Sequence, residues 1–384
     1  MDVALRARLK TFFIIISYFF LHSSFFIIHY KEMSRTKKII AIDAHGGDNA
    51  PNAVFGGMNQ YLFLNGEDSI FFRIFGHEDR LRNLLKKYPR VARNSMLIHA
   101  PDTIKPTDKV AEIVRHAAET SMYKAIKDVR AGESCAIVSA GNTGVLMALA
   151  KLGLKTIEGI SRPAITTMMP CGDGDGRVVM LDLGANIHCD KEMLFDFAIM
   201  GSVYAEAIGG RIRPKLGLLN IGEEDQKGLD ALQILNKTLN ENKSKLPYDY
   251  VGFIEGNDIG GGAVHVVVTD GFTGNIVLKT VEGTAKLIKR VLMEAMKKSL
   301  LAIVGMFFLV NVFKRLKHKI DPRSYAGAVF MGVNGFVVKT HGASDALAFC
   351  NAIGYAAKMA ESDVNGKIKY HAEKLSTIKS QLTQ

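Results

Sequence analysis

Five loops of this sequence combine glycine with side chains that could bind an anion. They read DAHGGDNAP (43–51), SAGNTG (139–144), DLGAN (182–186), NIGEEDQKG (220–228) and TDGFTGN (269–275). Glycine lets backbone N–H groups approach an anion closely, and a helix that begins just after such a loop adds a favourable dipole. Any one loop could be an ordinary strand-to-helix turn, but five together favour a site for a phosphate or an oxyanion.

The stretch KTHGASD near the C-terminus could add to this chemistry. His341 could act as a base, and Ser344 and Asp345 could bind phosphate or cap the last helix. We do not expect a Ser-His-Asp triad, because these three residues are too close in sequence to adopt its geometry. In the AGNTG loop, Asn142 and Thr143 offer amides and a hydroxyl group to an anion.

Several standard signatures are missing from the sequence. There is no GxGxxG after a strand, no GxxxxGK[ST], no GxSxG and no HExxH. The usual grounds for a Rossmann dehydrogenase, a P-loop NTPase, an α/β-hydrolase or a zincin are therefore absent. The GDGDG run at 172–176 is typical of a hairpin turn before a strand.

The elements that must position these loops alternate along the chain. Short, nearly continuous apolar runs predict strands buried on both faces, at Ile39–Asp43, Ile70–Gly76, Cys135–Ser139, Val178–Leu183, Leu216–Asn220, Val251–Ile254 and Val264–Thr269. Helical patterns lie between them, at Ala53–Leu64, Ala111–Val129, Met193–Ile208 and Thr273–Met296. We therefore expect one α/β/α sandwich domain with a mostly parallel sheet, over residues 33–384, with ligands at the carboxyl ends of its strands.

Composition and charge limit the classes of function. The 384 residues include 49 Lys and Arg against 38 Asp and Glu. The excess is local: residues 1–38 hold seven cations and two anions, and residues 289–323 hold nine and two. This is not the pervasive basic face of a nucleic-acid binder. Four scattered cysteines without a CxxC pair indicate reduced thiols, without disulfides or structural zinc.

Two apolar segments could meet a membrane. Residues 1–32 include FFIIISYFFLHSSFFIIHY, which is interrupted by polar residues; this extension is either dispensable or absent from the mature protein, or a weak membrane segment. Residues 299–313 lie in a helical tip at about 290–322 and would reach about 22 Å as a helix, short of the roughly 30 Å of a bilayer core. Cations on both flanks favour an interfacial helix, and a buried core or dimer helix is the alternative. The candidates there for contact with a membrane or with the surface of an acidic protein are Lys297, Lys298, Phe307, Phe308, Leu309, Lys314 and Arg315.

Taken in order, the loops and their neighbours form a recognisable set. IIAIDAHGGDNAP, VSAGNTGVLMA, GISRPA, LDLGAN, FAIMGSVYAEA, LLNIGEEDQKG, VVVTDGFTGNIVLKTVEG and KTHGASDA run from about Ile39 to about Ala357. The series resembles the bacterial phosphate acyltransferase of phospholipid synthesis. The chain departs from the common family pattern at His45 and Asn49 in the first loop, and at Leu229, where the family carries a polar residue.

The resemblance implies transfer of a fatty acyl group from acyl carrier protein to inorganic phosphate, without a cofactor or a metal. It also implies a cytosolic homodimer, peripherally bound to the inner face of the membrane, and we expect a membrane glycerol-3-phosphate acyltransferase to receive the acyl phosphate. The family's proposed catalytic lysine and asparagine fall on Lys227 and Asn275. An ammonium can attract phosphate and an amide can stabilise an oxyanion, although a solvated lysine and a helix cap are the plainer interpretations. The expected substrate-binding residues are Gly46, Gly47, Asp48, Asn142, Thr143, Gly184, Asn186, Gly274, His341, Ser344 and Asp345.

Three other functions are compatible with these patterns. A phosphotransacetylase acting on acyl-coenzyme A would use the same architecture, as would a decarboxylating NAD(P) dehydrogenase. A membrane-surface scaffold would use the basic tip but would leave the five glycine loops unexplained. Asp43, Asp182 and Asp270 could bind a divalent ion, or equally could cap helices or hold the glycine turns.

Overall fold

The structure of the protein is a computed structural model that describes residues 37–105, 107–172, 176–297 and 327–383. The N-terminal extension and the apolar segment at 299–313, with its contact candidates from Lys298 to Arg315, lie outside the described residues. Lys297 is the last residue of a described helix, but its side chain is outside the description. Contacts group Lys38–Gln384 into one unit, which contains the sheet and the candidate loops.

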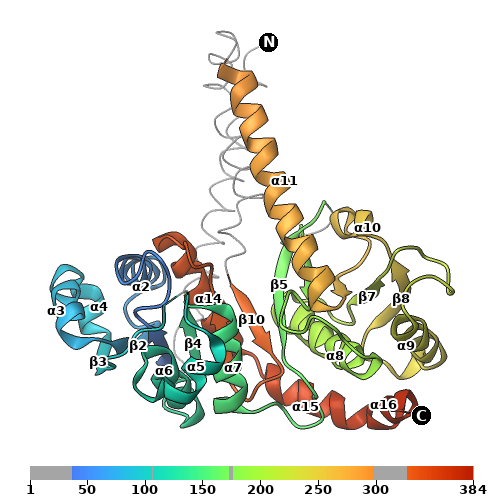
Figure 1. Cartoon of the computed structure of the whole chain (residues 1–384), viewed down its shortest axis with the longest axis horizontal. Coiled ribbons are helices and arrows are strands. Elements are labelled where there is room, and N and C mark those ends of the chain that lie inside the picture. The colour runs from blue at the N-terminus through green and yellow to red at the C-terminus, as the bar shows by residue number, and fades with distance from the viewer. Residues whose placement is uncertain (1–36, 106, 173–175, 298–326, 384) are drawn as a thin grey trace, which may run out of the picture. The chain divides into compact units, whose positions relative to one another are not determined.

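One sheet of 11 strands runs through this unit (Figure 1). In chain order its strands are β1 (Lys38–Asp43), β2 (Ile70–Gly76), β3 (Ser95–His99), β4 (Ala136–Ser139), β5 (Ala164–Pro170), β6 (Arg177–Leu181), β7 (Lys215–Leu219), β8 (Asp249–Ile254), β9 (Val266–Val268), β10 (Ala328–Met331) and β11 (Phe336–Lys339). Their order across the sheet is β3-β2-β1-β4-β11-β10-β5-β6-β9-β7-β8. Two strands from the end of the chain, β10 and β11, therefore stand in the middle of the sheet.

Strand direction divides the sheet into two halves. All pairs from β3 through β11 are parallel, and so are the pairs among β6, β9, β7 and β8. The three successive pairs β11–β10, β10–β5 and β5–β6 are antiparallel. The β6 half consequently runs opposite to the β1 half, so the carboxyl ends of the strands form one group of loops in each half.

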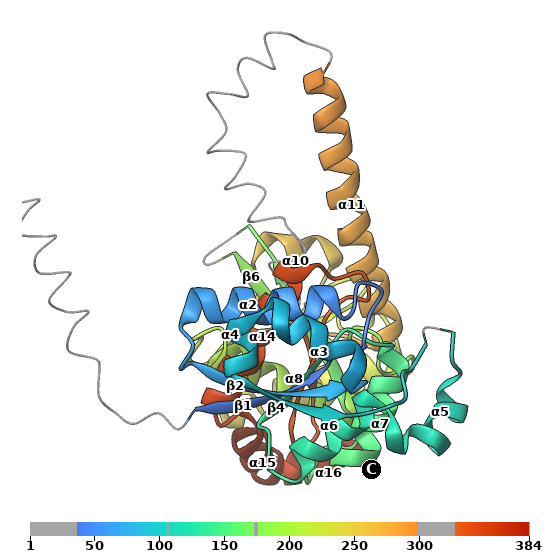
Figure 2. The same ribbon diagram turned by 90° about the vertical axis from the view of Figure 1, so that its left-hand side faces the viewer.

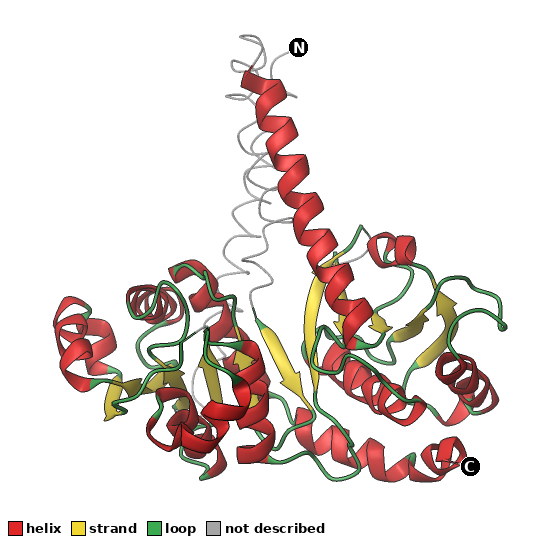
Figure 3. Cartoon of the chain, viewed as in Figure 1, coloured by secondary structure: helices red, strands yellow, loops and turns green. Residues whose placement is uncertain are grey.

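Helices cover both faces of the sheet (Figure 3). They are α2 (Asn52–Asn65), α3 (Glu78–Lys87), α4 (Pro89–Arg93), α5 (Val110–His116), α6 (Ser121–Arg130), α7 (Thr143–Leu154), α8 (Lys191–Ala207), α9 (Asp230–Glu241), α10 (Gly256–Gly261), α11 (Gly271–Lys297), α14 (Ala346–Glu361), α15 (Val364–Lys374) and α16 (Ser376–Thr383). Two short 3-10 turns complete them, at Ala117–Glu119 and Lys243–Lys245. None of the helices in the described ranges is long and apolar enough to cross a bilayer.

The sheet has a separate hydrophobic core on each face. Successive side chains of a strand point to opposite faces, and in β1 Ile40 and Ile42 join the core under α2 and α14 while Ala41 joins the core under α6 and α7. Figure 2 shows α2 on one side of β1 and β2 and α6 on the other. Because both faces are covered, the strands are almost continuously apolar, as parallel strands buried on both sides must be.

The predicted α/β/α architecture with a mostly parallel sheet is confirmed, as is the hairpin predicted at the GDGDG run, but one predicted helix differs. The helix predicted at Ala111–Val129 is broken: Thr120 adopts an extended conformation and caps α6 by accepting the N–H of Tyr123. The GDGDG run does join two antiparallel strands, since β5 pairs with β6 and Cys171 N–H donates to Gly176 O at 2.9 Å.

Candidate functional site

The first group of loops follows β1, β4 and β11, three neighbouring parallel strands. The loops touch one another directly: Asp48 N–H donates to Gly342 O at 2.8 Å, and Thr340 N–H donates to Ser139 O at 3.0 Å. Gly47 has φ +100°, and a Cβ there would stand only 2.8 Å from Ala140 Cβ. The structure therefore brings together three of the stretches that the sequence singled out.

A buried carboxylate lies under this first group. Asp43 is 1% exposed at the end of β1, and its two oxygens accept Ser121 Oγ at 2.7 Å and Ser139 Oγ at 2.6 Å. Ser139 Oγ in turn accepts the N–H of Gly141 at 3.0 Å. Each oxygen of Asp43 is thus used to hold a neighbouring strand or helix, which is a structural role.

A buried lysine that the sequence patterns did not single out lies in the same place. Lys339 ends β11, is 7% exposed, and its Nζ donates to Ala140 O at 3.4 Å and to Thr340 O. Burial lowers its pKa to about 8, with Asp43 and Asp48 acting in the opposite direction. The only sequence signal for this residue is a lysine at the end of the apolar run FVVK.

The polar candidates of the first group mostly order the backbone. Asn142 Oδ1 caps α7 by accepting Val145 N–H at 3.1 Å, and Asp345 Oδ1 caps α14 by accepting Ala348 N–H at 2.9 Å. His341 Nδ1 accepts Ala343 N–H at 3.1 Å, and Ser344 Oγ lies 2.7 Å from Thr340 Oγ1. Thr143, in contrast, is exposed at the first turn of α7.

The second group of loops follows β6, β9 and β7, also neighbouring and parallel. Its centre is Asp182, a fully buried carboxylate that accepts three N–H groups on Oδ1, from Ile165, Gly184 and Ala185, at 2.9–3.2 Å. Its Oδ2 accepts the backbone N–H and the side-chain Nδ2 of Asn186, at 2.7 and 2.9 Å. Burial raises the pKa of Asp182 and these hydrogen bonds oppose that rise. Asp182 and Asn186 therefore hold the DLGAN loop in shape.

Close packing against this loop positions Asn275. A Cβ on Gly274 would overlap the carbonyl oxygen of Asp182, so only glycine allows α11 to pass there. Gly184 has φ +124°, and a Cβ there would lie 3.6 Å from Asn275 Cβ. Asp270, not Asn275, caps α11, because its carboxylate accepts Thr273 N–H at 2.9 Å. The Asn275 side chain is exposed and makes no hydrogen bond to the described residues, so its amide is available to a ligand.

Lys227 lies in the loop after β7. Its backbone is held by Asn220 Nδ2, which donates to Lys227 O at 3.0 Å, while its side chain is exposed. Gly222 packs against it: a Cβ there would stand 3.1 Å from Lys227 Cγ. Since Leu218 of β7 pairs with Val268 of β9, this loop follows the strand beside the one that leads into α11.

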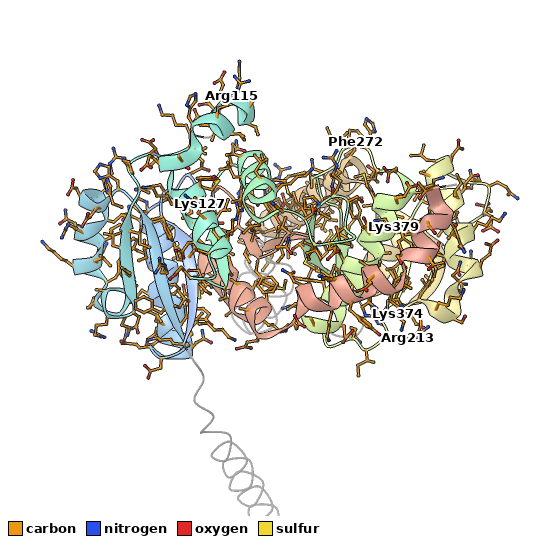
Figure 4. The ribbon with its side chains drawn as sticks, turned by 90° about the horizontal axis from the view of Figure 1, so that it is seen from below. Arg115, Lys127, Arg213, Phe272, Lys374 and Lys379 are labelled. Atoms are coloured by element: carbon orange, nitrogen blue, oxygen red, sulfur yellow. The ribbon has the colours of Figure 1, made fainter. Side chains whose placement is uncertain are left out.

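Large apolar side chains are exposed on the loops that carry Asn275 and Lys227, and at the ends of these loops. They come from all three loops of the second group: Ile187 is 64% exposed, Ile221 80%, Leu229 70%, Phe272 60% and Ile276 51%. Phe272, Asn275, Ile276 and Lys279 are spaced as one face of α11. Figure 4 shows Phe272 at the outer edge of the ribbon. Exposed polar and exposed apolar side chains therefore occur together on the second group of loops.

The two groups approach each other through α11. Lys279, which lies one turn after Asn275, is close enough to Lys339 for its charge to lower the pKa of that buried lysine. The five loops therefore do not line one edge of a single parallel sheet, as ligand loops do in simple open sheets. They form two sets on oppositely directed halves, and α11 brings them within electrostatic range.

Other parts of the described chain offer less. Among these residues there is no group of three or more His, Cys, Asp and Glu that could hold a metal ion, and the four cysteines are free. A surface hollow of about 540 Å³ lies between α9 and the C-terminal helix, with Lys237, Glu241 and Gln381 in its wall. It contains none of the candidate site residues.

The chain is similar to known acyltransferases over most of its length. A family model described as "Fatty acid synthesis protein" matches residues 38–367. A phosphate acyltransferase from Paramagnetospirillum magneticum is 43% identical over 336 residues, covering 88% of this chain and 94% of that protein. A second, from Rhodospirillum centenum, is 44% identical over 330 residues, covering 86% and 91%.

Solved structures with a similar fold include two phosphotransacetylases. The one from Streptococcus pyogenes aligns with a TM-score of 0.57 and 16% identity, covering 85% of this chain and 95% of that chain. The one from Staphylococcus aureus aligns with a TM-score of 0.54 and 18% identity, covering 84% and 94%. At this level of identity the likeness concerns the fold.

Proposed function

The chain belongs to the phosphate acyltransferase family, and from this premise we propose that it transfers a long fatty acyl group from acyl carrier protein to inorganic phosphate. The product, an acyl phosphate, would serve phospholipid synthesis. A phosphate oxygen attacks the thioester carbonyl carbon and forms a C–O bond. The tetrahedral oxyanion then collapses, the C–S bond breaks, and the thiolate leaves and takes a proton from solvent.

Asn275 and Lys227 have the chemistry that this reaction needs. The exposed amide of Asn275 can donate to the developing oxyanion, and the exposed ammonium of Lys227 can neutralise charge on phosphate. No protein nucleophile is required, because phosphate attacks directly once it is positioned. The thiol leaving group needs little electrophilic help, so we propose neither metal nor cofactor.

The observation that supports a substrate with a long acyl chain is the exposed apolar surface on the loops that carry Lys227 and Asn275. Ile187, Ile221, Leu229, Phe272 and Ile276 are all more than half exposed, and large exposed apolar patches usually mark a binding surface. At about 0.8 kcal/mol per buried methylene group, such a surface favours a fatty chain over a short one. The alternative is a phosphotransacetylase-type enzyme that acts on short acyl-coenzyme A.

The test is phosphate-dependent release of free thiol from palmitoyl-(acyl carrier protein). We expect release with wild-type protein, and much slower release from acetyl-coenzyme A. Asn275→Ala should lower kcat by about 10²–10³, the cost of one lost oxyanion donor. Lys227→Ala should raise the phosphate requirement, whereas Lys237→Ala, an exposed lysine on α9, should change nothing. Wild-type kinetics in both site variants would refute the assignment of these two residues.

We further propose that the enzyme is a cytoplasmic homodimer on the inner face of the membrane, where a glycerol-3-phosphate acyltransferase would receive the reactive product. The proposed membrane contact is supported by the later turns of α11, which expose the apolar side chains of Leu287, Ile288, Val291 and Leu292. The test replaces Phe307, Phe308 and Leu309 together with Asp and measures oligomeric state and sedimentation with anionic liposomes. An active dimer that no longer sediments supports the membrane role of that segment, and a monomer refutes it.

A further inference from the structure

Lys339 is a buried lysine with no carboxylate in salt-bridge range among the described residues. A lysine ammonium has three N–H donors, and the described acceptors of Lys339 are two carbonyl oxygens, Ala140 O and Thr340 O. Charges that are buried in proteins are normally paired, because desolvation of an isolated ion is costly. Lys339 therefore lacks a counter-ion that an anionic ligand could supply.

The nearest carboxylate is already engaged elsewhere. Asp43 attracts Lys339 electrostatically, but each of its oxygens accepts a serine hydroxyl, from Ser121 and from Ser139. Asp48 also attracts Lys339, whereas Lys279 repels it and so adds to the positive charge. The charge of Lys339 is thus only partly compensated from the elements around it.

Backbone groups of the first loop surround Ala140 O, one of the two carbonyl oxygens that accept a hydrogen bond from Lys339. A Cβ on Gly47 would stand 3.4 Å from Ala140 O and 2.9 Å from Gly342 O, so the first loop lies directly against the lysine's acceptor. The N–H groups of Gly46 and Gly47 donate to no described residue. Helix α7 begins at the same place, at Thr143, and the first N–H groups of a helix have no partner within it.

We infer that Lys339 is the buried cation of a phosphate site formed by the loops after β1, β4 and β11. This rests on the proposed function in one respect, since it identifies the bound phosphate with the attacking substrate. In this arrangement the ammonium of Lys339 attracts the anion, its two carbonyl contacts hold the loops at Ala140 and Thr340, and glycine amides of the first loop contact the anion. Lys227 then adds a second positive charge to the same phosphate from the second group of loops.

The test measures binding of inorganic phosphate to the full chain by titration calorimetry, without any thioester. We expect Lys339→Met to weaken phosphate binding about 10- to 100-fold, the cost of a lost charge-assisted interaction. The matched control is Lys151→Met, on the far end of α7 from the loops, which should bind as wild type. An unchanged phosphate affinity in Lys339→Met overturns the inference, as does a wild-type protein that binds no phosphate at millimolar concentration.

A phosphate group could also come from the prosthetic arm of the acyl donor, and the same variants distinguish the sources. If Lys339→Met binds inorganic phosphate as wild type but binds acyl-coenzyme A more weakly, the site holds the donor's phosphate and the inference is overturned. Phosphate binding that depends on Lys339, without any phosphate-dependent thioester cleavage, would keep this inference and refute the proposed function. The two claims therefore fail separately.

Sulfate supplies a second measurement, which does not depend on the folding of a variant. The charge of sulfate is constant near neutral pH, so any change in its affinity with pH must come from titration of a group on the protein. We expect wild-type sulfate affinity to fall as pH rises through about 8, because Lys339 loses its proton there. Asp43, Asp48 and Lys279 are the other charged groups that act on Lys339, and burial lowers the pKa of the nearby loop histidine His45. A flat sulfate profile between pH 7 and 9 would overturn the role of Lys339.

Discussion

Gly274→Ala should disable the enzyme by moving one helix. The added Cβ would overlap the carbonyl oxygen of Asp182, and Asp182 cannot yield because its carboxylate is held by hydrogen bonds in a fully buried loop. The helix must therefore move, by on the order of 1 Å, and a misplacement of that size can cost about 100-fold in rate. Asn275 is the next residue and moves with it. Overpacking of this kind also costs about 1–3 kcal/mol of stability.

The same helix offers a matched control. Gly283 lies in α11 with nothing within 4 Å of a Cβ built on it. Gly283→Ala should stabilise the helix by about 0.5–1 kcal/mol, because alanine loses less conformational entropy than glycine. Both variants are assayed for thiol release from palmitoyl-(acyl carrier protein) and for thermal unfolding. If Gly274→Ala turns over at the wild-type rate, α11 does not position Asn275.

Three further outcomes are expected. Asp43→Asn should lose about 2 kcal/mol of stability in denaturant unfolding, because an amide keeps an acceptor for only one of two buried serine hydroxyls; an unchanged midpoint would contradict this. Lys379→Met should lower the free energy of unfolding by about 3 kcal/mol, because Lys379 of α16 (labelled in Figure 4) donates at 2.6 Å to the fully buried Asp196 of α8. A change below about 1 kcal/mol would argue against a structural ion pair. Folding lowers the pKa of Lys339 from 10.5 to about 8, so between these pH values the unfolded chain binds a proton that the folded chain does not. The free energy of unfolding of the wild type should therefore rise by up to about 3 kcal/mol from pH 8 to 10.5, measured relative to Lys339→Met.

Local patterns predicted the loops and most of the strands well. β2 begins and ends where the apolar run at Ile70–Gly76 does, and α11 lies within two residues of its predicted bounds. Four strands were missed: β5 carries two threonines and two methionines, β3 reads SMLIH, and β10 and β11 are the short runs AVFM and FVVK. Their strand conformation comes from pairing with neighbours, which the local sequence does not encode.

Long-range placement cannot be derived from local sequence patterns. Nothing near Phe336–Lys339 indicates that this strand inserts beside β4, about 200 residues earlier in the chain, so Lys339 could not be placed under the glycine loops. Likewise, three antiparallel pairings reverse the second half of the sheet, and strand patterns carry no direction. Helix capping was an expected alternative for Asp345 but not for Asn142, and both cap helices. Whether a side chain caps a helix or binds a ligand depends on contacts that only the fold defines.

The insertion of β10 and β11 into the middle of the sheet also bears on how the chain is made. During synthesis the strands up to β9 emerge first, while β4 and β5 lack the pair that joins them until residues 328–339 appear. Until then two apolar strand edges stand open, and such edges readily pair with other chains. Contacts this distant in sequence also form slowly. A ribosome that stops before residue 328 would therefore release a chain with two open strand edges, which is prone to aggregate.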